Sequence, residues 1–514
     1  MANEFGAGFA HDSFLLAYRI PSVMRELFAE GAFLAAFVPT FTGVLSKDGR
    51  KAASSMANVI LTASLIVVTV LCVAGMIGAP AIVRVMAPGF AAVPGKQELA
   101  VLLTRIMFPF LLLISLAAQA TGMLNSSGRF ATAALSSALF NVGAIALGLV
   151  LGRWMGPHIG MSEIAGMACG VVLGAALQLA AQLPALHRLG FRFRLSFDWS
   201  HPAFRKIVRL MAPALLASAA LQINMVINTN FASQISDPLR GAHGAVSWLG
   251  YAMRLVQFPL GMFGVAFASA MLPSISRSAA LMNFEEFRRT LSRSLSVVLL
   301  LTIPSSLGLI VLSRPIVGAI YESGEFRPYD TEQTALALGC YAIGLCAYAS
   351  ARILNHAFYA LGDARTPMYV SLFSIVLNFG LPLLLVRQLH AGFAGLALTT
   401  SFAVAAECIC LFVLLGRKVG GIDTRYLADR CARVLSASLV MAFPVWLLHT
   451  QIFDRFPPGR IAYFEELAFC VPVGLLLFAI GCRALGINEV RVGTNAVKAP
   501  LLKGWVAAYG WIRG

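Results

Sequence analysis

Five arginines lie inside apolar stretches of this sequence, where a charged side chain needs a physical reason. They are Arg19, Arg25, Arg105, Arg254 and Arg352. A charge at the centre of a bilayer costs about 2.5–3.5 kcal/mol on insertion scales, so such residues usually face a water-filled cavity or a partner. A guanidinium near a helix end can instead extend to the membrane surface. We expect that position for Arg105 and a cavity position for Arg25 and Arg254, while both interpretations stay open for Arg19 and Arg352.

Acidic residues accompany the first of these arginines. Asp12, Arg19 and Glu26 share one face of an ideal helix, because steps of seven residues advance close to two turns. They could form an internal ion-pair ladder or serve the cavity, and for Glu26 both roles stay open. Asp12, near the outer end, could gate access or lie in solvent. We expect Glu30 to be a hydrogen-bonded structural residue beside Gly31, where helices pack closely.

Glu407 lies in the middle of another apolar stretch. A carboxyl group at such a position needs a partner or a proton. It could be a protonated, hydrogen-bonded structural group or a site of proton coupling. We prefer the structural interpretation.

The composition defines the elements that must position these residues. Hydrophobic residues make up 59% of the 514 residues and charged residues 12%, whereas soluble domains have about 45–50% apolar and about 25% charged residues. A soluble, disordered or coiled-coil chain is excluded, and a polytopic helical membrane protein is predicted. Thirteen apolar helical runs are predicted, at residues 12–43, 54–86, 97–124, 130–152, 160–186, 205–235, 243–276, 290–320, 331–361, 367–386, 391–415, 432–450 and 465–485.

The basic residues alternate between the loops. The loops after the odd-numbered runs hold 25 Lys and Arg, and the intervening segments on the other side hold nine, among them Lys96. Lys and Arg accumulate in cytoplasmic loops, so this pattern predicts a cytoplasmic C-terminus. It also accounts for the net charge of +16 without a nucleic-acid partner.

An internal repeat indicates two lobes. FAEGAFLAAF at residues 28–37 matches FPLGMFGVAF at 258–267, and Ser-x-x-x-Asn-x-Gly recurs at 137–143 and 374–380. A parallel repeat predicts two similar lobes with a cavity between them. In the second copy a full helix precedes the matching segment, so we expect the first lobe to lack a helix of about 25–30 residues, judged from the length of a membrane span.

The predicted fold is therefore an all-α polytopic membrane protein. It has two pseudo-symmetric six-helix lobes, the first lacking its first helix here, and two further C-terminal helices. The predicted parts are an N-terminal lobe (1–186), a basic amphipathic linker (187–209), a C-terminal lobe (205–418), and two extra helices with a cytoplasmic tail (419–514).

Several segments resemble those of a known family. The second-helix signature of MurJ-type (MviN) lipid II flippases resembles the segment FGAGFAHDSFLLAYRIPSVMRELFAEGAFLAAFVPTF of this chain. These flippases are members of the multidrug/oligosaccharidyl-lipid/polysaccharide exporter superfamily. Later segments also resemble this family: residues 211–233, 254–276, 321–326 (YESGEF) and 359–367 (YALGDARTP). The resemblance covers nearly the whole chain in order.

The resemblance implies a mechanism and a substrate. The substrate would be lipid II, an undecaprenyl-pyrophosphate-linked disaccharide-pentapeptide, which moves from the inner to the outer leaflet of the bacterial cytoplasmic membrane by alternating access. A cationic cavity between the lobes would accept the pyrophosphate, which suits arginine because its planar fork binds phosphate bidentately. Arg25 and Arg254 match cavity arginines of the family, and Asp12 matches a functional acidic position.

These considerations define the predicted site. The substrate-binding residues are Arg25, Arg254, Asp12, Arg19 and Arg352, and the structural or gating residues are Glu26, Glu30, Gly31 and Glu407. No enzyme motif, cofactor site or metal site is predicted, since Asn378 lacks a set of nearby carboxylates and the His residues lack metal-ligand spacing. Membrane lipids and peptidoglycan-synthesis enzymes are the other implied partners.

Two alternatives stay open. The chain could export another lipid-linked oligosaccharide, or it could be a non-transporting scaffold of the cell-wall machinery. An exporter of cationic drugs is disfavoured, because it would require an acidic cavity rather than five intramembrane arginines.

Overall fold

A computed structural model describes most of the backbone. The described residues are 1–26, 32–155, 158, 162–239, 241, 243–388, 392–451 and 459–487. Their regular structure is helical, apart from an isolated bridge between Asp237 and Gly241. The helices form two compact units, one comprising Met1 and Phe5–Ser247, the other Ala2–Glu4 and the chain from Trp248 onwards.

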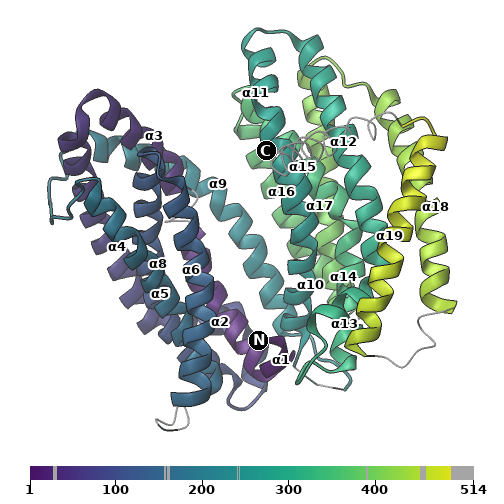
Figure 1. Ribbon diagram of the computed structural model, residues 1–514, viewed down its shortest axis with the longest axis horizontal. Helices are drawn as coiled ribbons and strands as arrows, with labels where there is room; N and C mark the ends of the chain where they lie inside the picture. Colours follow the sequence, from purple (N-terminus) through teal and green to yellow (C-terminus); the bar gives the residue numbers. More distant parts are fainter. Residues whose placement is uncertain are drawn as a thin grey trace, which may run out of the picture. The chain divides into compact units, whose positions relative to one another are not determined.

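The first unit contains seven α-helices longer than two turns among its described residues (Figure 1). They are α2 (Phe9–Arg25), α3 (Ala32–Lys47), α4 (Gly49–Met86), α5 (Lys96–Ser126), α6 (Phe130–Leu149), α8 (Glu163–Arg188) and α9 (Pro202–Ser233). The short helix α1 (Ala2–Phe5) lies at the start of the chain, the 3-10 helix η2 (Pro88–Ala92) follows α4, and the π-helix η3 (Val150–Met155) extends α6.

Close helix packing holds the first unit together. In lipid, association depends on side-chain fit and on small residues that let backbones approach. Helices α2, α5 and α8 share a core that includes Phe14, Phe110 and Ala168. Where α6 meets α8, a Cβ added to Gly170 would lie 2.4 Å from the Cα of Gly148. Glycine is therefore required at this crossing.

The second unit contains the helices from α10 onwards, except that the first residues of α10, up to Ser247, belong to the first unit (Figure 1). They are α10 (Ala245–Pro259), the π-helix η4 (Leu260–Val265), α11 (Ala266–Ala280), α12 (Phe284–Val311), α13 (Ser313–Tyr321), α14 (Pro328–Ile343), α15 (Leu345–Ala360), α16 (Arg365–Pro382), the π-helix η5 (Leu383–Gln388), α17 (Gly392–Lys418), α18 (Thr424–Gln451) and α19 (Arg460–Ala484). Helix α18 packs on α12 and α19, around a core that includes Leu300, Val434 and Cys482.

The helices correspond to the predicted apolar runs. Within the described part of the chain, nine helices are long and apolar enough to cross a membrane. Helices α14 and α15 together form a tenth candidate, bent by 42°. The other three predicted runs correspond to α2 with α3, to α9, and to α10 with η4 and α11. The chain is thus an all-helical, multi-pass membrane protein, as the composition predicted.

Helix α9 lies at the boundary between the two predicted lobes. It packs against α3 and α4, so packing groups it with the first unit. The internal repeat instead assigns it to the second lobe. The lobe boundary drawn from the repeat therefore stays a prediction.

The predicted linker has no regular secondary structure over residues 191–198. The backbone N–H of Arg194 donates to Asn58 Oδ1 at 3.2 Å, and that of Ser196 donates to Thr62 Oγ1 at 3.0 Å. These bonds hold the segment along α4 and leave Phe193 and Phe197 exposed.

Candidate functional site

Asp12 is the most completely enclosed of the predicted site residues. It lies in the first turn of α2 and is 1% exposed. Its carboxylate accepts hydrogen bonds from Lys96 Nζ at 2.8 Å, from the backbone N–H groups of Gly244 and Ser247 at 3.0 Å each, and from the Ser247 hydroxyl at 2.5 Å. The alternative that Asp12 lies in solvent is therefore excluded.

The partners of Asp12 explain why a carboxylate is used at this position. Helix α10 begins at Ala245, so the N–H groups of Gly244 and Ser247 belong to a first turn that lacks intrahelical acceptors. An anion there satisfies these donors and is stabilised by the helix dipole. Asp12 thus caps α10 from a helix more than 230 residues earlier in the chain.

Lys96 was missed as a site residue, because it was counted among the outer loop charges. It is 0% exposed, and its ammonium lies 4.4 Å from the centroid of the Phe90 ring. Nδ1 of His243 is 3.4 Å from Lys96 Nζ. Among the partners of Asp12, Ser247 has a further neighbour, since its Oγ is 2.7 Å from Nδ1 of His11. Only a three-dimensional arrangement brings Lys96 to Asp12, which is 84 residues away.

Arg19 and Glu26 both contact α9. Arg19 Nη1 donates to Thr229 Oγ1 at 2.6 Å, and Gln222 Nε2 donates to Glu26 Oε2. Arg19 and Glu26 are seven residues apart, and so are their partners Thr229 and Gln222 on α9. The residues of each helix therefore lie on one face of it. The shared face of Arg19 and Glu26 is confirmed, with α9 as their neighbour.

Arg25 lies beside α5 in the first unit. It is partly buried, and its guanidinium carbon is 5.9 Å from the centroid of the Phe110 ring. This distance is at the limit of a cation–π interaction. The Phe110 ring is therefore one of the groups that support the arginine.

Arg254 and Arg352 lie in the second unit. Arg254 is on α10 and Arg352 on α15, and both side chains are exposed. Tyr321, at the end of α13, lies within electrostatic reach of Arg254. Neither arginine forms an ion pair with any other described residue. Both guanidinium groups can therefore receive an anion.

Arg105 makes a contact that the sequence analysis did not anticipate. Its Nε donates to the backbone carbonyl of Met76 at 3.1 Å. Pro80, four residues after Met76 on α4, has no N–H to offer that carbonyl. The exposed Arg105 therefore satisfies a backbone group that proline leaves free, which is a structural role.

Glu407 has a different environment from Asp12. It is partly buried on α17 and accepts a hydrogen bond from Ser371 Oγ at 3.4 Å. It forms no ion pair within the described ranges of the chain. The remaining predicted positions, Glu30 and Gly31, lie outside the described residues.

A second buried acid was missed in the sequence. Glu466 on α19 is 4% exposed, and its Oε1 is 2.6 Å from Nδ1 of His449 on α18. The two residues are on different helices and 17 positions apart, so no spacing pattern indicates the pair. This contact joins the two last described helices.

The GDARTP segment joins α15 to α16. Asp363 accepts hydrogen bonds from the N–H groups of Arg365 and Thr366, and Lys418 Nζ at the end of α17 lies 2.5 Å from its Oδ2. The hydrogen bond from the Lys418 ammonium holds the pKa of Asp363 well below its usual range. This motif is therefore a helix cap and an interhelical ion pair.

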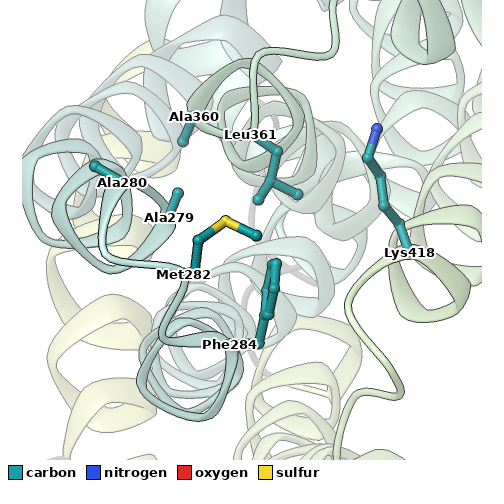
Figure 2. A pocket seen from close by; sticks show the side chains of 7 residues that line it. All are labelled: Ala279, Ala280, Met282, Phe284, Ala360, Leu361 and Lys418. Carbon is teal, nitrogen blue, oxygen red and sulfur yellow. The ribbon is translucent and has the colours of Figure 1, made fainter.

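A cavity of about 290 Å³ lies beside Lys418, and Figure 2 shows the side chains that line it. Its lining is apolar except for Lys418 and consists of Ala279, Ala280, Met282, Phe284, Ala360, Leu361 and Lys418. None of the predicted site residues lines it. The cavity therefore does not support the predicted site.

Helices of this number and apolarity define a multi-pass membrane protein. A family profile described as "Lipid II flippase MurJ" matches residues 1–462. A probable lipid II flippase MurJ of Vibrio cholerae is 34% identical over 463 residues, covering 88% of this chain and 85% of that protein. The lipid II flippase MurJ of Burkholderia cenocepacia is 33% identical over 427 residues, covering 82% and 80%. The chain therefore belongs to the lipid II flippase MurJ family.

Solved structures show the same fold. A lipid II flippase MurJ in an inward closed conformation matches with a TM-score of 0.76 and 24% identity, covering 94% of this chain and 95% of that one. An inward-facing multidrug resistance MATE family transporter of the MOP superfamily matches with a TM-score of 0.68 and 16% identity, covering 80% and 91%. At these identities the likeness concerns the fold.

Proposed function

We infer that the chain is a lipid II flippase, which moves this precursor across the membrane by alternating access. The observation that carries the inference is the family match over residues 1–462, together with relatives above 30% identity that are named for this activity. The chain is a transporter and not an enzyme. The fold shared with a MurJ structure agrees with this function.

Within this function, we propose that Arg25 and Arg254 bind the pyrophosphate. Arg25 is proposed because it matches a cavity arginine of the family. The exposed guanidinium of Arg254 retains donors for a ligand, since it forms no ion pair with a described residue. A guanidinium binds phosphate through two parallel hydrogen bonds. Arg352 is a further candidate for the same reason.

Asp12 has a different proposed role. Its carboxylate is fully used by Lys96 and the first turn of α10, so it has no capacity left for substrate. We propose that it positions α10, on which Arg254 lies seven residues after Ser247. Arg19 and Glu26 similarly fix α2 against α9.

The remaining features follow from the proposed function. The protein would lie in the bacterial cytoplasmic membrane, with the basic loops and the C-terminus in the cytoplasm. Peptidoglycan-synthesis enzymes would use the transported precursor. Cysteine labelling in intact cells tests the orientation, since an impermeant reagent should not reach residues 417–433 from outside.

Complementation of a bacterium depleted of its own lipid II flippase tests the proposed function. Arg25→Ala and Arg254→Ala should each abolish rescue while the protein stays in the membrane at normal levels. Losing one charge-assisted hydrogen bond weakens binding by about ten- to a hundredfold. Lysine should rescue in part, because it keeps the charge and loses the bidentate geometry.

Arg105→Ala is the matched control. It removes an arginine from an apolar helix, but one whose partner is a backbone carbonyl, so rescue should persist. The site proposal is contradicted if Arg25→Ala and Arg254→Ala both still rescue growth, or if their loss of rescue follows loss of folded protein. The function itself is contradicted if the unmodified chain, present in the membrane, fails to move lipid II in reconstituted vesicles.

A further inference from the structure

Glu407 lies deep within a predicted membrane span and has no ion-pair partner among the described residues. Helix α17 runs from Gly392 to Lys418, which places Glu407 about 22 Å from its start and about 16 Å from its end at 1.5 Å per residue. No ion pair to Glu407 exists among the residues that the structure describes. An isolated carboxylate at this depth would be costly, so a proton or a change of exposure must compensate.

The helices around Glu407 present polar groups with unused hydrogen-bonding capacity. On α16, the Ser371 hydroxyl donates to Glu407 at 3.4 Å. Ser374, one turn further and 1% exposed, lies close to the same carboxyl, but its hydroxyl makes no hydrogen bond of ordinary geometry. The side-chain oxygen of Asn355 on α15 is buried and also lacks a partner.

These groups share a location with Glu407. Tyr348 and Tyr359 on α15 both lie within electrostatic reach of the carboxyl. Arg352 and Asn355 lie on the same face of this helix, because they are four and seven residues after Tyr348. Helix α15 packs on α17, and α16 packs on α17 as well. The titratable and charged groups on these helix faces are thus the two tyrosines, the exposed Arg352 and, on the helix of Glu407 itself, Cys408.

Arg352 is the positively charged member of this set, and it forms no ion pair with Glu407. The hydroxyl and amide oxygens can instead accept a hydrogen bond from a protonated carboxyl. Glu407, Ser371, Ser374 and Asn355, here called the Glu407 cluster, are therefore suited to a neutral carboxylic acid. This arrangement differs from the Asp12 environment, which is suited to the anion.

We propose that Glu407 is a proton-binding site that couples transport to protons. The carboxylate takes one proton from water when the cluster is open to water, and the acid returns it to water when the cluster opens again. While helices α15, α16 and α17 enclose the group, it stays neutral. The coupling part of this proposal rests on the proposed flippase function, whereas proton binding does not.

Infrared difference spectroscopy of the purified full chain in lipid tests proton binding directly. The spectrum of the unmodified protein should contain a band of a protonated carboxyl group that Glu407→Gln removes. Glu163→Gln, at an exposed position at the start of α8, is the control and should leave the band in place. Glu407→Asp should shift the band, and it serves as the second variant if the glutamine variant does not fold.

Flipping of lipid II in reconstituted vesicles at a series of pH values tests the coupling. The rate of the unmodified protein should change with pH by up to about tenfold per pH unit, the limit for one titrating proton. Glu407→Gln should flip with a rate that does not follow pH, and Glu163→Gln should behave as the unmodified protein.

Each outcome decides one part of the proposal. A band that is absent, or unaffected by Glu407→Gln, overturns proton binding. A band that disappears while the pH dependence of Glu407→Gln remains normal overturns coupling. If the unmodified chain does not flip lipid II at all, the proposed function and with it the coupling fail, while the infrared result still decides proton binding.

Discussion

Asp12 in the first unit and Glu407 in the second are both carboxyl groups within largely apolar helices, yet their surroundings are opposite. Asp12 is 1% exposed and receives a buried ammonium, two backbone N–H groups and a hydroxyl. Glu407 receives one long hydrogen bond from a serine. The first environment stabilises a permanent anion, and the second suits a group that exchanges a proton.

The two environments separate a carboxylate that stays charged, Asp12, from a carboxyl group that can change its charge, Glu407. The Asp12 environment joins the first turns of α2, α5 and α10, so a change there would disturb three helices at once. The Glu407 cluster has unsatisfied oxygens, so a change of protonation there can be accommodated by rotation of side chains. Stability should therefore depend on the first site and pH response on the second.

Removing the buried cation beside Asp12 should have the largest effect. Lys96→Met leaves Asp12 charged, buried and without its ion-pair partner, which costs about 3–5 kcal/mol of stability. Thermal unfolding of the purified protein in detergent measures this loss. Lys51→Met, which removes an exposed lysine, is the control and should change the midpoint little.

A double variant sharpens this test. Asp12→Asn with Lys96→Met removes both charges, so its loss of stability should be smaller than the sum of the two single losses, because the groups interact directly. If the loss of stability of the double variant equals the sum of the two single losses, the two side chains do not stabilise each other. The 2.8 Å contact would then have no energetic role.

The helices were predictable from the sequence, because apolar length and charge punctuation follow directly from the membrane as solvent. Each predicted run has a helical counterpart. The 42° bend between α14 and α15 was not foreseen. It depends on Gly344, where an added Cβ would lie 2.8 Å from Ser401 Oγ, and such a contact between distant segments has no local pattern.

The site was predictable in its residue types and less so in its pairings. The seven-residue spacing of Arg19 and Glu26 correctly placed both on one face, because that depends only on helix geometry. The partners Lys96, Thr229 and Gln222 lie on other helices, so tertiary packing selects them. Lys96 was counted as a loop charge for the same reason, although it is fully buried.

A smaller effect is expected where α2 meets α9. Thr229→Val removes the acceptor of the 2.6 Å bond from Arg19 and keeps the side-chain shape. We expect a loss of about 1.5 kcal/mol, the low end for a hydrogen bond to a charged group, because Arg19 makes further contacts. Thr229→Ser keeps the hydroxyl and should lose less in the same thermal unfolding measurement. If serine and valine destabilise equally, the hydroxyl is not the stabilising group.

The ion pair between Asp363 and Lys418 should have the smallest effect. Like Asp12 and Lys96 it joins an aspartate to a lysine, but it is partly exposed to solvent. The Lys418 side chain is 42% exposed, so solvent screening limits the pair to about 0.2–1 kcal/mol. Hydrogen bonding to Lys418 lowers the pKa of Asp363. A carboxyl whose pKa is lowered in the folded state adds stability above its unfolded pKa of about 3.9, and this stability is lost as the pH falls through the folded pKa.

Lys418→Gln should therefore lower the unfolding midpoint slightly at neutral pH and not at all in strong acid. The neighbouring exposed Arg417→Gln makes the same change of charge without touching Asp363, so its effect should not follow the titration of that carboxyl. Identical pH profiles for the two variants would show that net charge, and not this contact, determines the response.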